Sequence, residues 1–415
     1  MPLLPFTILW LWFRGVLAVV ILGGGLYLLY QWYDHLPRPS VSLEQHDTTV
    51  ARTPMPPPTF RDRLVLWRPG LDWDTAALGG GLLLVLLASS GGMWVVLLRW
   101  PAGTDDLKAT RDGTVQRLTR PDGTVLQVEC YGPPDAPPLL VTHGWGVTST
   151  QWSYLKRELT ARFRLIVWDL PGCGFSTRPA NADYSLDKMA RDLDAILTSI
   201  EPRPVVLLGH SLGGMILLTF CRLFPEALGS RVCGLILAHT TYTNPVRTTA
   251  KPRLYTALQK PVLEPLLRLT IWLSPLVWLL NVLSYLNGTA QVSTARQSFD
   301  GTATRGQVRF VTRFLLQISP AVLARGMFGM LRYDATATLN TLPVPVLIVA
   351  GDQDTSTTPQ ASTFMKAAIP GAQLTMLTPA KHQGVLEHHT SFAQAVAAFC
   401  APCSPAGPRA SRPHE

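Results

Sequence analysis

The chain has 415 residues, enough for one large domain with appendages or for two domains of average size. Hydrophobic residues make up 47% of it and charged residues only 15%, and the mean hydropathy is positive, so the composition favours membrane segments over disorder. The formal net charge of +9 comes from scattered Lys and Arg residues without a basic run, which argues against a nucleic-acid partner and favours weak attraction to anionic lipid headgroups.

Two uncharged stretches in the N-terminal third predict transmembrane helices. The first covers residues 6–33 and is interrupted only by Arg14, and the second covers residues 76–98 and is followed by Arg99 and Trp100, which suit a membrane interface. Each is long enough to cross a hydrocarbon core of ~30 Å. The first has no basic segment ahead of it and no small-residue cleavage site, so we expect an uncleaved anchor and an integral membrane protein.

The segments around these stretches carry weaker signals for structure and for the side of the membrane. Residues 34–75 are rich in proline and are expected to form an extended loop without chemistry, and residues 404–415 a disordered tail. Lys and Arg flank the two stretches evenly, so the positive-inside rule leaves open the side of the membrane on which the rest of the chain lies. The six sparse cysteines favour a reducing compartment and therefore the cytoplasmic face. Cys400 and Cys403 have no second ligand pair, so we expect no metal and no cofactor.

An α/β domain is predicted over residues 105–402, where short β-type runs alternate with helical stretches. A hairpin is expected around Pro121-Asp122-Gly123, with strands at Thr114–Leu118 and Thr124–Tyr131. Buried strands are then expected at Pro138–Thr142, Arg164–Trp168, Val205–Leu208, Gly234–Ala238 and Val344–Ala350. Polar residues follow these strands, at the edge where open α/β sheets place their ligand crevice.

The most informative segment is Gly209-His210-Ser211-Leu212-Gly213, which joins an apolar strand to a helical stretch. Gly-x-Ser-x-Gly in this context is typical of a nucleophile elbow, a strained turn that exposes the serine at the sheet edge. Glycines remove the Cβ atoms that would clash there, and the helix N-terminus directs N–H groups at developing negative charge. The pattern therefore predicts Ser211 as a nucleophile.

An acid and a histidine follow in the order that such a fold requires. Gly351-Asp352-Gln353-Asp354 comes after the strand at Val344–Ala350, and His382 comes after a β-type run at Leu374–Leu377. Spacing alone allows either Asp352 or Asp354 as the acid. His388 and His389 are rivals for the base but begin a helical stretch, where a solvated surface role is commoner. His143 and His210 lie in the glycine-rich turns, where structural hydrogen bonds are expected.

These motifs together resemble the α/β-hydrolase superfamily, especially its esterase and lipase members, over residues 112–400. The motifs are His143-Gly144-Trp145-Gly146, Asp169-Leu170-Pro171-Gly172-Cys173-Gly174-Phe175-Ser176, Gly209-His210-Ser211-Leu212-Gly213-Gly214, Gly351-Asp352-Gln353-Asp354 and Lys381-His382. The resemblance implies a mostly parallel sheet with helices on both faces, and a triad of Ser211, Asp354 and His382. It places the oxyanion hole at the backbone N–H groups of Trp145 and Leu212. The sequence departs from the family in lacking the common glycine ahead of His382, which bears on loop shape.

About a hundred residues, 240–342, separate two of the expected strands, and the family places its lid there. Residues 269–286 within this insertion are uncharged and predict an apolar lid, because a third membrane span would separate Ser211 from His382 unless another span returned the chain. The apolar lid residues would contact a lipid-like acyl chain or the membrane. The alternative is that they form the hydrophobic core of the cap. The overall prediction is a membrane-anchored serine hydrolase of small-molecule or lipid esters. The alternative is a binding or signalling module that keeps this fold with little turnover.

Overall fold

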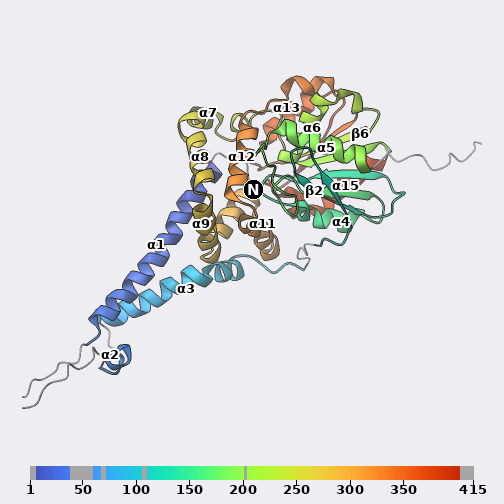
Figure 1. Ribbon diagram of the computed structural model, residues 1–415. Helices are drawn as coiled ribbons and strands as arrows, with labels where there is room; N and C mark the ends of the chain where they lie inside the picture. The colour runs from blue at the N-terminus through green and yellow to red at the C-terminus, as the bar shows by residue number, and fades with distance from the viewer. Residues whose placement is uncertain (1–5, 38–58, 67–71, 105–109, 201–202, 402–415) are drawn as a thin grey trace, which may run out of the picture.

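The computed structural model describes residues 6–37, 59–66, 72–104, 110–200 and 203–401 (Figure 1); the expected tail at 404–415 lies outside them. Within these residues one sheet has eight strands in the order β1-β2-β4-β3-β5-β6-β7-β8. Their bounds are β1 Thr114–Thr119, β2 Val125–Tyr131, β3 Pro138–Thr142, β4 Arg164–Trp168, β5 Val205–His210, β6 Val232–Ala238, β7 Val346–Gly351 and β8 Gln373–Leu377. β2 is antiparallel to β1 and β4, and the strands from β4 to β8 in this order are parallel. The expected hairpin and mostly parallel sheet are confirmed.

The sheet is buried on both faces: the central strands β3, β5 and β7 are mostly apolar, and all their residues are buried. In β3, Leu140 belongs to one core cluster while Leu139 and Val141 belong to the other, as the two-residue repeat of a strand requires. Helices cover both faces: α4 Ser153–Leu159, α5 Leu186–Ile200, α6 Leu212–Leu223, α13 Pro359–Ala368, α14 Gly384–Glu387 and α15 His389–Cys400. Short turns of 3-10 helix lie at η1 Ser149–Trp152, η2 Pro225–Ala227, η3 Pro245–Arg247 and η5 Thr336–Thr341. The parallel strands end at a common edge, where their C-terminal residues come together.

The two N-terminal apolar stretches form long helices, α1 Phe6–His35 and α3 Trp73–Arg99, which pack side by side and extend away from the sheet (Figure 1). Glycines allow the close approach: a Cβ on Gly25 would lie 3.0 Å from Leu84, and one on Gly81 would lie 2.8 Å from Leu29. The segments Trp12–His35 and Trp73–Arg99 are long and apolar enough to cross a membrane.

The segment between these helices is not entirely a loop, contrary to the expectation for residues 34–75. A helix, α2 Phe60–Leu66, follows the last residue of the Pro56–Pro58 run. Its Arg63 donates hydrogen bonds to the carbonyl oxygens of Tyr33 and Leu36, at 2.5 and 3.0 Å. These carbonyls lie at the end of α1, where carbonyl oxygens have no N–H donor within the helix. The proline-rich composition of the segment as a whole predicted a loop, although residues 60–66 contain no proline.

The insertion between β6 and β7 is helical and contributes to both core clusters. It contains α7 Pro252–Leu258, a π-helical turn η4 at Gln259–Leu263, α8 Glu264–Trp272, α9 Ser274–Leu286, α10 Thr289–Ser298, α11 Arg305–Gln317 and α12 Pro320–Leu331. Val322 of α12 lies in the core on one side of the sheet, and Val308 and Val311 of α11 lie in the core on the other. The insertion is therefore packed onto the domain over much of its length.

The apolar part of the insertion, residues 269–286, is not one straight helix. It is divided between α8 and α9, and the chain bends by 94° between the helical segments Pro252–Trp272 and Ser274–Leu286. α9 lies against both long helices: a Cβ on Gly15 of α1 would meet Leu280 at 2.7 Å, and one on Gly92 of α3 would meet the carbonyl oxygen of Tyr285. Exposed apolar side chains remain on the outer surfaces of α8 and α9, namely Leu269, Trp272, Leu276, Trp278, Leu279 and Leu286.

Candidate active site

Ser211 occupies a sharp turn between β5 and α6. Its φ and ψ are 56° and −117°, outside the regions that most side chains adopt. Only glycines fit around it, because a Cβ on Gly209 would lie 2.4 Å from the Gly213 carbonyl carbon, and one on Gly213 would lie 2.4 Å from the Thr142 oxygen. The Ser211 N–H donates to Ala238 of β6 at 2.9 Å, which ties the turn to the neighbouring strand. The turn has the strained strand-to-helix form of a nucleophile elbow.

His382 and Asp354 extend from Ser211 in a line of hydrogen bonds. The Ser211 Oγ lies 3.0 Å from His382 Nε2, and His382 Nδ1 lies 2.8 Å from Asp354 Oδ2. His382 lies in the loop after β8, and Asp354 lies in the loop after β7. The structure thus brings together all three residues expected to form the triad, although the chain separates Ser211 and His382 by 171 positions.

Asp354 is fixed by further donors. Its Oδ1 accepts hydrogen bonds from the N–H groups of Ser356 and Thr357, at 2.8 and 3.1 Å, and its Oδ2 accepts one from the Thr357 hydroxyl. Burial by itself raises the pKa of Asp354, but the electrostatic interaction with His382 and the hydrogen bonds from His239 and His382 outweigh it and hold the pKa well below its usual range. The carboxylate therefore stays ionised and can orient an imidazole.

The His382 imidazole is kept neutral by its surroundings. It is fully buried, and burial lowers its pKa below the ordinary value of 6.5, while the Asp354 charge and hydrogen bond oppose the shift without cancelling it. With Nδ1 donating to the carboxylate, Nε2 carries the lone pair that faces the Ser211 hydroxyl. This is the protonation state in which a histidine can accept a proton from serine.

The two expected oxyanion donors lie beside Ser211. Leu212 begins α6 directly after the serine, so its N–H has no helical partner. Trp145 follows Gly144, where an added Cβ would lie 3.4 Å from the Ser211 Cβ. The Trp145 indole is held by α12, since its Nε1–H donates to the Leu323 carbonyl oxygen at 3.0 Å and its ring leaves no room for a Cβ on Gly326. Contacts with α12 of the insertion therefore fix the loop that carries Trp145.

The rival residues occupy structural positions. Asp352 accepts a hydrogen bond from the Ala380 N–H at 2.9 Å, so it shapes the loop before His382. His143 accepts from the Leu170 N–H at 3.0 Å, and His210 Nε2 bonds the carbonyl oxygen of His382 at 3.0 Å. The structural hydrogen bonds expected of these two histidines are present.

His388 and His389 are partly buried and engaged, so the expectation of a solvated surface role is wrong. His388 Nε2 bonds the carbonyl oxygen of Pro379, and the His389 ring stacks on Tyr154 with centroids 3.9 Å apart. His388 is the N-cap residue of α15, and His389 is its first residue.

The sequence did not single out His239, which follows β6. It is buried with a φ of 44°, and its Nδ1 lies 3.3 Å from Asp354 Oδ2. A histidine after a central strand was a usable signal, because neighbouring parallel strands bring their C-terminal residues together. His239, Asp354 and His382 each offer one atom within 4.8 Å of the others, a spacing that could hold a metal ion. A metal there would compete with the 2.8 Å hydrogen bond between His382 and Asp354.

Comparison with known proteins places the chain in a family. Residues 137–389, more than half of the 415, match the family described as alpha/beta hydrolase fold, so the chain belongs to this family. A pimeloyl-[acyl-carrier protein] methyl ester esterase of Nitrosospira multiformis is 28% identical over 279 residues, which cover 66% of this chain and 97% of that protein. The enzyme of the same name from Aeromonas salmonicida is 36% identical over 107 residues, which are 26% of this chain and 40% of that protein.

The solved structure of a thermophilic esterase from Thermogutta terrifontis superimposes with a TM-score of 0.58 at 23% identity. The match covers 70% of this chain and all of that one. At this level of identity the likeness supports the fold.

Proposed function

We propose that the chain hydrolyses carboxylic esters through Ser211, His382 and Asp354. The observation that carries the proposal is the chain of hydrogen bonds from Ser211 through His382 to Asp354. The Ser211 Oγ lies 3.0 Å from His382 Nε2, and His382 Nδ1 lies 2.8 Å from Asp354 Oδ2. Esterase relatives and membership of the α/β-hydrolase family support the same chemistry.

In the proposed reaction the Ser211 Oγ attacks the ester carbonyl carbon while His382 Nε2 takes the hydroxyl proton. The carbonyl oxygen becomes an oxyanion, which the N–H groups of Trp145 and Leu212 stabilise. His382 then gives the proton to the departing alcohol, leaving an acyl-enzyme at Ser211. Water activated by the same imidazole releases the acid. Asp354 keeps the proton on Nδ1 throughout and stabilises the imidazolium.

The second part of the proposal is that α1 and α3 anchor the protein in a bilayer, with the catalytic domain at its surface. α3 has 27 residues and, at 1.5 Å per residue, extends about 40 Å, enough for a core of ~30 Å. Most of its outward side chains are apolar, as are most of those of α1, and Arg14 is buried with its Nη2 donating to Asn281 of α9 at 3.2 Å. Because α9 packs on both helices, its exposed apolar residues would continue the lipid-facing surface, which favours an apolar, lipid-like acyl group as substrate.

Ester turnover should depend on one deprotonation with an apparent pKa below 6.5. His382 must be neutral to accept the serine proton, and burial lowers its pKa, so kcat/KM should rise with pH through that lowered pKa and stay level above pH 7. A pH profile of kcat/KM with a p-nitrophenyl ester measures it. An apparent pKa well above 6.5 would contradict the assignment of His382 as a buried base.

Acyl preference distinguishes the lipid proposal from plain esterase activity. We expect kcat/KM for p-nitrophenyl esters to increase from acetyl to octanoyl, since each CH₂ buried is worth about 0.8 kcal/mol. The full-length protein in detergent micelles is assayed with esters of rising chain length, all below their critical micelle concentrations. Activity confined to the acetyl ester would leave the hydrolase in place and remove the lipid-like substrate.

Membrane anchoring predicts that the protein resists extraction by alkali. A protein crossing the bilayer with α1 and α3 should remain in the pellet after a wash with alkaline sodium carbonate and dissolve only in detergent. Immunoblotting of the wash, pellet and detergent fractions measures this. Recovery in the carbonate wash would show that the helices do not cross the bilayer.

A further inference from the structure

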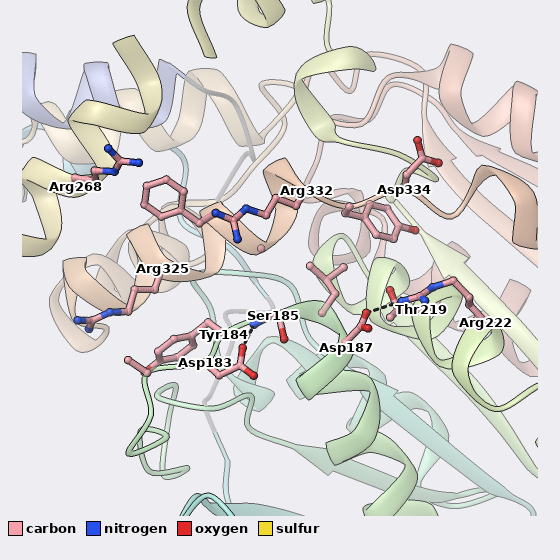
Figure 2. A pocket seen from close by; sticks show the side chains of 15 residues that line it. Asp183, Tyr184, Ser185, Asp187, Thr219, Arg222, Arg268, Arg325, Arg332 and Asp334 are labelled. Carbon is pink, nitrogen blue, oxygen red and sulfur yellow. Dashed lines mark hydrogen bonds and ion pairs between the residues drawn. The ribbon is translucent and has the colours of Figure 1, made fainter. Parts of the chain in front are cut away.

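A cavity of about 670 Å³ lies apart from the triad, between α8, α12, the C-terminal part of α6 and the segment that leads into α5 (Figure 2). Its walls carry four arginines: Arg222 of α6, Arg268 of α8, Arg325 of α12, and Arg332, which directly follows α12. Residues far apart in the chain therefore place four arginines on the wall of one cavity.

Only one of these arginines forms an ion pair within the described part of the chain. Arg222 pairs with Asp187 at 2.5 Å. In the part of the chain that the structure describes, Arg268, Arg325 and Arg332 make no side-chain ion pair or hydrogen bond. The cavity wall therefore carries three arginines whose guanidinium groups are not taken up by an ion pair among the described residues.

The acidic residues on the cavity wall are already engaged. Besides Asp187, they are Asp183, which accepts a hydrogen bond from the Ser185 N–H at 2.9 Å, and Asp334, which accepts bonds from the Thr336 N–H and hydroxyl. The lining as a whole carries four arginines against three aspartates, so the cavity keeps a net positive charge.

We propose that this cavity binds the phosphate group of a phospholipid, at a site separate from the catalytic one. Guanidinium groups are planar, always charged and matched to phosphate oxygens in pairs, so several around one hollow favour a phosphate over a halide or a neutral ligand. The walls also include Leu186 and Phe328, which offer apolar contact to the glycerol and first acyl carbons of a lipid. Inorganic phosphate would make no contact with these apolar side chains.

The position of Arg268 favours a lipid as the source of the phosphate. It is followed on α8 by Leu269 and, one turn on, by Trp272, which is 78% exposed. Thr270 of the same helix accepts a hydrogen bond from Trp12 of α1 at 3.2 Å. The free guanidinium thus stands beside the apolar surface that continues from the candidate membrane helices, at the level expected for headgroups.

The residues that line the cavity include neither the triad nor the expected oxyanion residues. Leu323 and Gly326 of α12 contact the Trp145 indole, whereas Arg325 of the helix and Arg332 at its C-cap line the cavity. A lipid held by these arginines would therefore dock against the outer side of the insertion. Its binding can be measured without turnover.

The test is calorimetric titration of the full-length protein, in micelles of an uncharged sugar detergent, with an ether-linked dihexyl phosphatidylglycerol. This probe has no ester bond, so its binding does not depend on the proposed hydrolysis. We expect Arg325→Gln and Arg332→Gln each to weaken binding about tenfold, the range for a charged hydrogen bond, and the double variant to weaken it further. Arg313→Gln, an exposed arginine of α11 outside the cavity, is the matched control and should bind as the wild type does.

Two further probes distinguish the source of the phosphate. Dihexylglycerol without a phosphate should not bind, and inorganic phosphate should bind more weakly than the lipid but with the same dependence on Arg325 and Arg332. Equal affinity of the lipid for the wild type and the double variant would overturn the site. Inorganic phosphate binding as tightly as the lipid would overturn the phospholipid as its ligand. Unchanged thermal unfolding of the variants without ligand shows that they fold.

Discussion

Replacing Ser211 with alanine is expected to lower kcat for a p-nitrophenyl ester by about 10⁶, the scale on which a triad loses its nucleophile. The change removes the Oγ that lies 3.0 Å from His382 Nε2 and leaves the turn intact, because alanine has the same Cβ as serine. Labelling by a fluorophosphonate probe should disappear at the same time, since the probe reacts with an activated serine. Steady-state kinetics and in-gel fluorescence measure the two effects.

A matched control is Ser362→Ala on α13, another buried serine, whose hydroxyl has no hydrogen-bond partner in the described part of the chain. It should keep both activity and labelling. Equal labelling of the wild type and Ser211→Ala would show that another residue is the nucleophile. A wild-type protein that is neither labelled nor active would favour a binding module over an enzyme.

Asp354→Asn should lower kcat by about 10⁴, as when a triad loses its acid. The oxygen of the introduced amide can keep the bonds from Ser356 and Thr357, which leaves the amide NH₂ group facing His382 Nδ1. The imidazole would then carry its proton on Nε2, the nitrogen that must accept the serine proton. The effect should appear in kcat with little change in the temperature of unfolding.

Asp352→Asn provides the comparison on the same loop. The amide oxygen of asparagine can still accept the hydrogen bond from the Ala380 N–H, so turnover should change less than tenfold. Reversed effects of the two substitutions would assign the acid to Asp352. Parallel losses of activity and unfolding temperature in Asp354→Asn would instead indicate a structural role for this carboxylate.

The strands could be predicted because apolar runs bounded by turn residues are local signals. β3 and β4 have the expected bounds, and β5 continues two residues beyond Leu208 to His210. The helix α2 was missed because its stability depends on Arg63 reaching the end of α1, a contact between residues 30 positions apart. The bend between α8 and α9 and their packing on α1 and α3 likewise depend on tertiary contacts, which hydropathy does not report.

In the candidate site, too, the residues with local sequence signals were predicted and those that depend on tertiary contacts were missed. The motifs predicted Ser211 and His382 because each lies in a segment of distinctive composition, and the family pattern chose Asp354 over Asp352. His239 was missed because its contact with Asp354 joins residues 115 positions apart, across neighbouring strands of the sheet. The arginine cavity was missed for a similar reason, since its cations come from α6, α8, α12 and the residue after α12 and form no sequence motif.

The packing of α9 across α1 and α3 means that the hydrolase domain cannot be cut free of its N-terminal helices without damage. A fragment beginning near residue 105 would lose the partners of Leu280 and Tyr285 and leave Asn281 without Arg14. The newly bared side of α9 would join the apolar residues already exposed on its other side, and such a surface drives aggregation in water. Production of the enzyme for biochemical work therefore calls for the entire chain in detergent or lipid, even where only the chemistry of Ser211 is of interest.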